Sequence, residues 1–304
     1  MQYVITRLVI GEGRSIAISK EEFQSILTAQ DRITTILGIE QKLELLLWNF
    51  AEYESELLRL ALYHSIWVGS ASETLDDGWS SVNRRVLNLL AAVRMYLDQV
   101  RHEMSEMYGK DSSVYETLTR SISAQYDSVL AFRAMEGLRN HAQHRSLPLG
   151  TLSLPMSIHR EAPAVKFCFS AVPALDLEQL QYHGAIKPVI LDELRAMSEK
   201  PNLTELLRRY LSCITVIHGE FRRLSDPDVT SWAEVIRNVA VRAREAFDND
   251  IIGLGVASRD EGGWNVDYRY LWEDTLSQRQ LLLKKNRVPT DFANRYVSSE
   301  LDSD

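Results

Sequence analysis

The sequence predicts a mainly α-helical protein with an additional α+β region in its C-terminal half. Two observations predict this fold class. Between residues 40 and 144, apolar residues recur every three or four positions, which is the period of a helix with one buried face. From residue 151 onward, segments that alternate between apolar and polar residues are mixed with further helical patterns. We therefore divide the chain into an N-terminal strand or hairpin (1–19), a helical domain (20–150) and an α+β accessory region (151–304).

The first elements follow from local patterns. Residues 1 to 20 alternate between apolar and polar side chains, as expected of a β-hairpin. Ser19 is a suitable N-cap for a short helix that follows it. The helical period that starts near Glu40 predicts a long helix ending at Trp67, and we interpret residues 69–79 as a loop.

The clearest helical pattern lies in the middle of the helical domain. Steps of four and three residues place one apolar stripe on a helix, formed by Val86, Leu90, Val93, Leu97, Val100 and Met104. A third helix is predicted from Val114 towards His144. Its inward face is apolar as far as Phe132 and then becomes polar at Glu136, Arg139 and Gln143. A buried face that turns polar over two turns is typical of a cleft.

Beyond Gly150 the sequence predicts two strands, two helices, a hairpin and a last helix, followed by a polar tail. Their ranges are 151–158, 165–171, 201–217, 231–247, 251–258 with 264–270, and 272–285. The hairpin is the clearest strand signal in the chain, because its two alternating segments are joined by a turn that contains Gly262 and Gly263.

Composition limits the class of protein. The net charge of −8 over 304 residues argues against a protein that coats nucleic acid non-specifically. An enzyme that cuts RNA at one site needs only local positive charge, which Arg133, Arg139 and Arg145 can supply. The first residues lack the apolar stretch of a secretory signal, and the apolar runs are far shorter than the roughly 20 residues of a membrane span. We therefore expect a cytoplasmic protein that has no membrane contact.

The most informative stretch is Leu138-Arg139-Asn140-His141-Ala142-Gln143-His144, at the end of the third predicted helix. It places a fixed cation, an orienting amide and a proton-transfer group within about two helical turns. RNA carries its own nucleophile, the 2′-hydroxyl, so these groups are sufficient to cleave it without a metal. We assign His144 to acid/base chemistry, Arg139 to the phosphate and transition state, and Asn140 to orientation.

This stretch resembles the Arg-x(4–6)-His motif of the HEPN superfamily, all-α proteins that include many ribonuclease toxins and phage-defence effectors. Arg139, Asn140 and His144 match the arginine, the polar residue that often follows it, and the histidine. The resemblance covers about residues 20–150 and implies a HEPN-like helical bundle. It also implies metal-independent RNA cleavage that leaves a 2′,3′-cyclic phosphate, and a homodimer in which the two motifs meet. An antitoxin or another defence-system protein is a further expected partner, and no cofactor is expected.

Neighbouring polar residues are candidates for binding the substrate. They are Arg133, Glu136, His141, Gln143 and Arg145. Glu136, His141 and His144 also offer metal-ligand side chains on adjacent turns, but no third histidine and no cysteine lies nearby in the sequence. We therefore expect no metal.

Two other interpretations remain open. In the first, Arg139 and Asn140 bond the last carbonyl groups of the helix, and His144 is favoured there by the helix dipole, with no further role. In the second, the helical domain is a non-catalytic HEPN sensor or scaffold that binds a nucleotide or a protein partner through the same cleft. The presence of a nucleotidyltransferase-like or CRISPR-type neighbouring gene would favour the ribonuclease.

Overall fold

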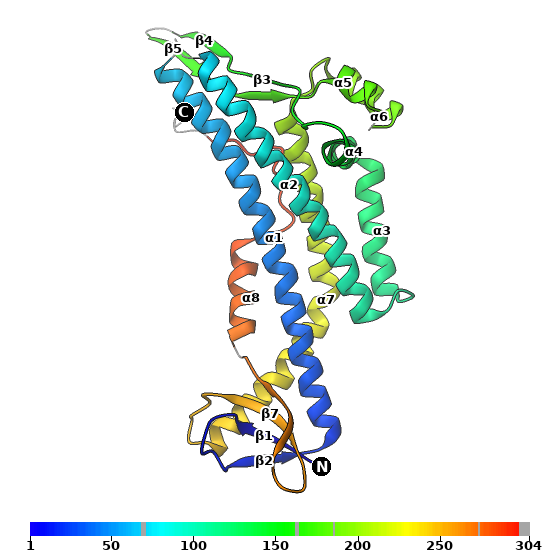
Figure 1. The fold of residues 1–304 in the computed structure, drawn as a ribbon, viewed down its shortest axis with the longest axis vertical. Coiled ribbons are helices and arrows are strands. Elements are labelled where there is room, and N and C mark those ends of the chain that lie inside the picture. Colours follow the sequence, from blue (N-terminus) through cyan, green and yellow to red (C-terminus); the bar gives the residue numbers. More distant parts are fainter. Residues whose placement is uncertain (68–70, 162–163, 185, 273, 298–304) are drawn as a thin grey trace. The chain divides into compact units, whose positions relative to one another are not determined.

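The computed structural model describes residues 1–67, 71–161, 164–184, 186–272 and 274–297 (Figure 1). Its helices are α1 (Lys20–Ile66), α2 (Ala71–Tyr108), α3 (Ser113–Ser128), α4 (Leu130–His144), α5 (Leu177–Tyr182), α6 (Pro188–Met197), α7 (Leu203–Ala246) and α8 (Asp274–Lys285). Its strands are β1 (Gln2–Arg7), β2 (Ser15–Ile18), β3 (Thr151–Ser153), β4 (Met156–Glu161), β5 (Ala164–Phe169), β6 (Val172–Ala174), β7 (Leu254–Arg259) and β8 (Asn265–Tyr270). The predicted fold class, mainly α with an additional α+β region, is confirmed.

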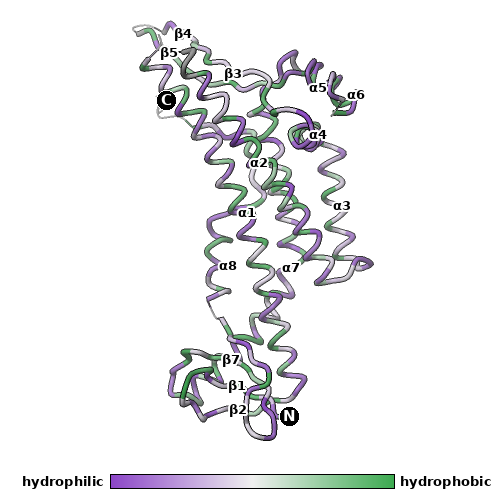
Figure 2. The backbone as a smooth tube through the Cα atoms, in the orientation of Figure 1, coloured by the Kyte–Doolittle hydropathy of each residue, from purple (hydrophilic) through white to green (hydrophobic). Residues whose placement is uncertain are grey.

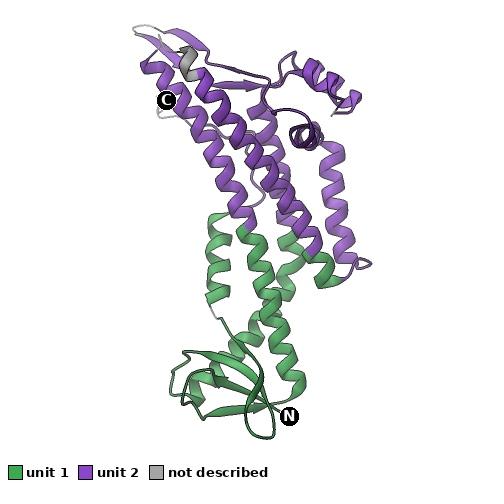
Figure 3. Cartoon of the chain, viewed as in Figure 1, with its two compact units in different colours: residues 1–41, 103–108, 221–287 green, residues 42–102, 109–220, 288–304 purple. Residues whose placement is uncertain are grey.

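Two compact units make up the chain, and each is assembled from segments that are separate in the sequence (Figure 3). Unit 1 contains residues 1–41, 103–108 and 221–287, and unit 2 contains residues 42–102, 109–220 and 288–304. Helices α1, α2 and α7 each contribute residues to both units. The contiguous ranges expected from the sequence, 1–19, 20–150 and 151–304, therefore follow different boundaries.

Unit 1 contains a four-stranded antiparallel sheet in the order β2-β1-β7-β8. Both predicted hairpins are present, β1 with β2 and β7 with β8. They are joined into one sheet because β1 also pairs with β7, so that Tyr3 lies opposite Ser258 as well as Ile18. One face of this sheet is apolar, and its Ile5 and Val256 belong to the buried core of the unit.

Helices α1 and α7 are longer than predicted, because each covers a stretch where the sequence patterns predict two helices. Helix α1 is continuous from Lys20, where the Ser19 hydroxyl caps it by accepting from the Glu22 N–H at 3.1 Å. Helix α7 is also continuous, although Pro227 lies inside it and separates the two helices that we predicted. A proline inside a helix costs about 3 kcal/mol. Phe221 and Val229, on either side of it, are buried, and this burial stabilises the unbroken helix.

Helix α2 begins earlier than predicted. Residues 71–79 belong to α2, and the interpretation of 69–79 as a loop is therefore wrong over this stretch; Gly69 itself lies outside the described residues. Gly78 lies inside this part of α2, although glycine disfavours helix interiors. A Cβ atom at Gly78 would lie 2.8 Å from the Leu60 Cδ2 atom, so the missing side chain lets α2 approach α1 closely.

The single helix predicted over 114–144 is two helices. Val129 adopts an extended conformation (φ −115°, ψ 111°) between α3 and α4, and α4 leaves the direction of α3 at this point (Figure 1). The amide of Val129 still bonds the Gln125 carbonyl, and its own carbonyl accepts from Phe132. Both backbone groups of Val129 are thus hydrogen-bonded although the helix is interrupted there.

In the remainder of unit 2, four short strands replace the two predicted strands. Pro155 separates β3 from β4, and β3 pairs with β6 while β4 pairs with β5. Helices α5 and α6 follow. Along the long helices α1, α2 and α7, apolar and polar residues alternate (Figure 2). The predicted polar tail at residues 298–304, like Pro163, lies outside the described residues.

Candidate functional site

Helix α4 carries the predicted motif at its C-terminal end. Its buried face consists of Ala131, Phe132, Ala134, Met135, Leu138 and His141. The helix ends at His144 because Arg145 leaves the helical conformation (φ −134°, ψ −71°), while its amide still bonds the His141 carbonyl at 2.8 Å. Two histidines, His141 and His144, lie in the last turn.

Side chains of the same helix hold Arg139. Its Nη1 donates to Gln143 Oε1 at 2.9 Å, and its Nη2 donates to Asn140 Oδ1 at 2.6 Å. Each Nη nitrogen carries two N–H groups, so one on each remains for another acceptor. The buried Nε of Arg139 has no hydrogen-bond partner among the described residues. The guanidinium is therefore fixed on the helix surface while part of its donor capacity is retained.

His144 lies one turn beyond Asn140 and is exposed, as are Asn140, Gln143 and Arg145. An exposed imidazole at the end of a helix is accessible to a large substrate such as RNA. Arg139 is half-buried, so a held cation is followed, five residues further along α4, by an accessible imidazole.

Glu136 is anchored within the chain by two other helices. Its Oε1 accepts from the hydroxyl of Tyr210 on α7 at 2.6 Å, and its Oε2 lies 3.6 Å from Arg94 Nη1 on α2. Burial and the charge of Glu136 raise the pKa of Tyr210 well above its ordinary value, so this hydroxyl remains a donor. Sequence patterns did not identify Arg94 and Tyr210, because they lie on helices far from the motif in the sequence.

Arg133, which we expected to add positive charge near the motif, forms a paired contact with Glu193 of α6. Its two Nη nitrogens lie 2.7 and 2.8 Å from the Glu193 carboxylate oxygens. The carboxylate offsets the arginine charge. Of the candidate cations, Arg139 and Arg145 have no carboxylate partner in the described part of the chain.

His141 differs from His144 in its surroundings. It is only 1% exposed, neither of its ring nitrogens has a hydrogen-bond partner among the described residues, and its ring lies 5.4 Å from that of His183. Burial lowers the pKa of His141, and the charges of His183 and Arg145 lower it further. His141 is thus a neutral core residue near pH 7.

No metal cluster joins these side chains. Within the described residues, no group of three or more His, Cys, Asp or Glu side chains is placed to share a metal ion. His64 of α1 is buried beside Phe169, with their rings 5.4 Å apart.

No protein-family model, curated protein or solved structure matches this chain. Within the described residues, no helix combines the length and the apolar character needed to cross a lipid bilayer. What the fold and the site define is a mainly helical protein with an arginine, an amide and an exposed histidine in sequence on the last turns of one helix.

Proposed function

We propose that this protein is a metal-independent endoribonuclease of the HEPN type. One observation carries the proposal: the Arg139 guanidinium is held by Asn140 and Gln143 at the end of α4, and His144 lies exposed just beyond it. A guanidinium is the preferred partner of a phosphate because its planar donors match the phosphate oxygens. An imidazole can accept or donate a proton near neutral pH.

The reaction follows from these roles. One imidazole accepts the proton of the RNA 2′-hydroxyl, and the 2′-oxygen then attacks the adjacent phosphorus. The bond between phosphorus and the 5′-oxygen breaks as the new bond forms, and the leaving 5′-oxygen receives a proton from an acid. The products are a 2′,3′-cyclic phosphate and a 5′-hydroxyl. Arg139 stabilises the extra negative charge on the phosphorane.

One motif supplies one exposed histidine, whereas the reaction uses a proton acceptor and a proton donor. We therefore place the active site between two copies of the chain, with His144 of the partner subunit as the second proton-transfer group. A composite site of this kind is inactive until the chains associate. It suits a toxin-like or phage-defence effector that acts in the cytoplasm and is restrained by an antitoxin or another defence-system protein.

The test is RNA cleavage by the purified full chain and by its Arg139→Ala and His144→Ala variants. Each single variant is expected to lose cleavage by about 100-fold or more, because each removes a group that acts in the transition state. Matched controls are Arg120→Ala and His159→Ala, which remove an exposed arginine and an exposed histidine outside the motif. A double variant that cleaves RNA at the wild-type rate would contradict the proposal, as would equal toxicity of wild type and double variant on expression.

The second candidate is a non-catalytic sensor or scaffold that binds a nucleotide or a protein through the motif face. It is favoured by the contacts of Arg139 with Asn140 and Gln143, since all three belong to α4 and satisfy one another as at an ordinary helix end. Binding of RNA or of a protein partner with no cleavage by the wild-type chain would favour this candidate.

A further inference from the structure

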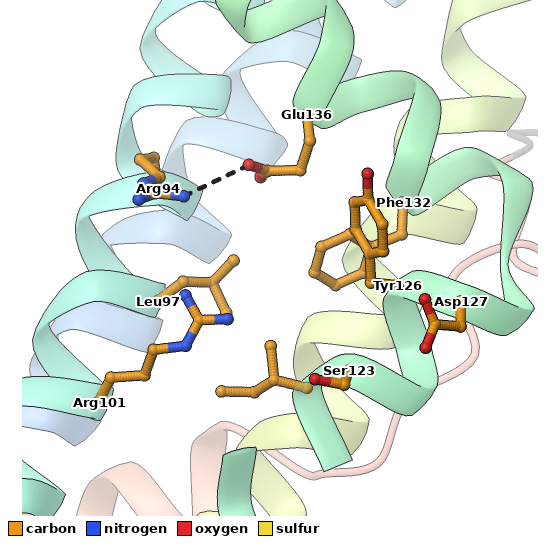
Figure 4. A pocket seen from close by; sticks show the side chains of 9 residues that line it. Arg94, Leu97, Arg101, Ser123, Tyr126, Asp127, Phe132 and Glu136 are labelled. Carbon is orange, nitrogen blue, oxygen red and sulfur yellow. Dashed lines mark ion pairs between the residues drawn. The ribbon is translucent and has the colours of Figure 1, made fainter. Parts of the chain in front are cut away.

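A cavity of about 250 Å³ lies between α2, α3 and α4 in unit 2, beside the motif helix (Figure 4). Its walls combine two arginines, Arg94 and Arg101, with two aromatic rings, Tyr126 and Phe132. Glu136 of α4 also lines it. Asp127 of α3 also lines it, so the cavity combines two guanidinium groups and two carboxylates with aromatic surface.

Arg101 is the cation of this cavity for which the described part of the chain supplies no partner. Among the described residues, no hydrogen bond or ion pair involves its guanidinium, which Figure 4 shows at the cavity wall. Arg94, by contrast, contacts Asp98 at 2.8 Å and Glu136 at 3.6 Å. An unpaired guanidinium in a partly enclosed site attracts an anion, and its geometry suits the paired oxygens of a phosphate.

Tyr126 offers the accessible aromatic ring of the cavity, because it is half-buried whereas Phe132 behind it is only 2% exposed. The Tyr126 and Phe132 rings meet edge to face, with their centroids 5.8 Å apart, and Phe132 is fixed in turn against Tyr210. Bases of single-stranded nucleic acids stack on such rings. The chemistry shared by both sides is that of a nucleotide, a planar base that carries a phosphate, and the volume suits one such unit.

Glu136 connects the cavity to the motif. It lies three residues before Arg139 on α4, and His144 is eight residues further along the same helix, about 12 Å at 1.5 Å per residue. A strand of RNA bound at the motif would therefore reach the cavity with a neighbouring nucleotide. We propose that the cavity binds one nucleotide of the RNA substrate near the scissile phosphate, with its base against Tyr126 and a phosphate at Arg101. This inference rests on the proposed function.

The experiment measures binding separately from cleavage. A 2′-O-methyl oligonucleotide, which lacks the nucleophile, is titrated into the full chain and its affinity is followed by fluorescence anisotropy. Arg101→Gln and Tyr126→Leu are each expected to weaken binding by about 10-fold, the magnitude of one lost stacking or phosphate contact. Arg120→Gln, on the exposed surface of α3, is the matched control and should bind like the wild type. Circular dichroism checks that each variant is folded.

The possible outcomes separate RNA binding at the cavity from RNA cleavage at the motif. Unchanged oligonucleotide affinity in both folded cavity variants overturns the inference, whether or not the wild type cleaves RNA. Binding of adenosine or uridine monophosphate that depends on Arg101, with oligonucleotide affinity unchanged by Arg101→Gln, also overturns it and assigns the cavity to a free nucleotide. Loss of oligonucleotide affinity in a chain that never cleaves RNA retains the cavity as an RNA site and removes only the proposed catalysis.

Discussion

Three tyrosines in different surroundings allow the contribution of a tyrosine hydroxyl to the free energy of unfolding to be compared. Tyr210, 1% exposed, donates to the Glu136 carboxylate at 2.6 Å, whereas Tyr53, fully buried, shares a 2.7 Å hydrogen bond with the neutral hydroxyl of Thr204. Tyr182 is 88% exposed. Tyr→Phe removes the same oxygen atom at each position and leaves the ring in place, so differences among the three variants report on the hydrogen bond alone.

The expected losses of unfolding free energy follow from these partners. A hydrogen bond to a charged group contributes about 1.5–3 kcal/mol, and one between neutral groups about 0.5–1.5 kcal/mol. Tyr210→Phe should therefore lose about 2 kcal/mol, because among the described residues Glu136 would keep only Arg94, at 3.6 Å, as a charged partner. Tyr53→Phe should lose about 1 kcal/mol, and Tyr182→Phe should stay within about 0.5 kcal/mol of the wild type.

Urea denaturation followed by circular dichroism measures all three, and the tyrosines all belong to unit 2, so the same unit reports each change. Burial also raises the pKa of both Tyr53 and Tyr210, which keeps their hydroxyl groups protonated over the pH range of the assay. Equal losses for Tyr210→Phe and Tyr182→Phe would refute the argument that Glu136 is anchored by Tyr210.

Three further predictions concern metals, assembly and pH. RNA cleavage should persist in excess EDTA and leave a 2′,3′-cyclic phosphate; loss on chelation that one divalent ion restores would favour a metal held by Glu136, His141 and His144 instead. Light scattering should show a dimer, with the end of α4 at its interface, and an active monomer would exclude a composite site. Burial, and then the charges of His183 and Arg145, lower the pKa of His141 from its ordinary value of 6.5 in the folded chain. The unfolded chain therefore takes up a proton at His141 more readily than the folded chain does. The free energy of unfolding should for this reason fall as the pH falls below 6.5. In urea denaturation at about pH 7.5 and about pH 5.5, His141→Leu should lose less of this energy than the wild type, and an equal loss would show that another group is responsible.

Local periodicity was enough to predict the elements whose contacts repeat along one helix or across one turn. The stripe from Val86 to Met104 is buried as expected on α2, and the hairpin of β7 and β8 forms where the alternation places it. Local signals failed where distant packing decides the outcome. Pro227 and Gly78 are helix breakers by propensity, yet each lies inside a helix. Buried side chains on both sides of Pro227, and the close approach of Leu60 to Gly78, outweigh that propensity.

The candidate site likewise contains residues that the sequence predicts and residues that only the packing of distant helices reveals. Arg139, Asn140 and His144 could be found from spacing, because one helix positions all three. The partners that shape their surroundings could not, because Arg94 and Arg101 come from α2 and Tyr210 comes from α7. On its own helix Tyr210 has only the pattern of a core residue, and its hydrogen bond to Glu136 becomes visible only when α4 and α7 are placed together.

The position of β1 inside its sheet has a consequence for the order in which the chain can fold. β1 can pair with β2 as soon as both are synthesised, but its other edge must wait for β7, and the hydrogen bond from Arg7 to the Ile252 carbonyl joins positions 245 residues apart. Contacts this distant in sequence slow folding, because the ends of a very long loop must meet before any pairing is gained. Until then β1 presents an unpaired strand edge, which is a template for association with other chains. A nascent or truncated chain that ends before β7 is therefore expected to aggregate through β1, and a chaperone that covers this edge would assist folding of the full-length chain.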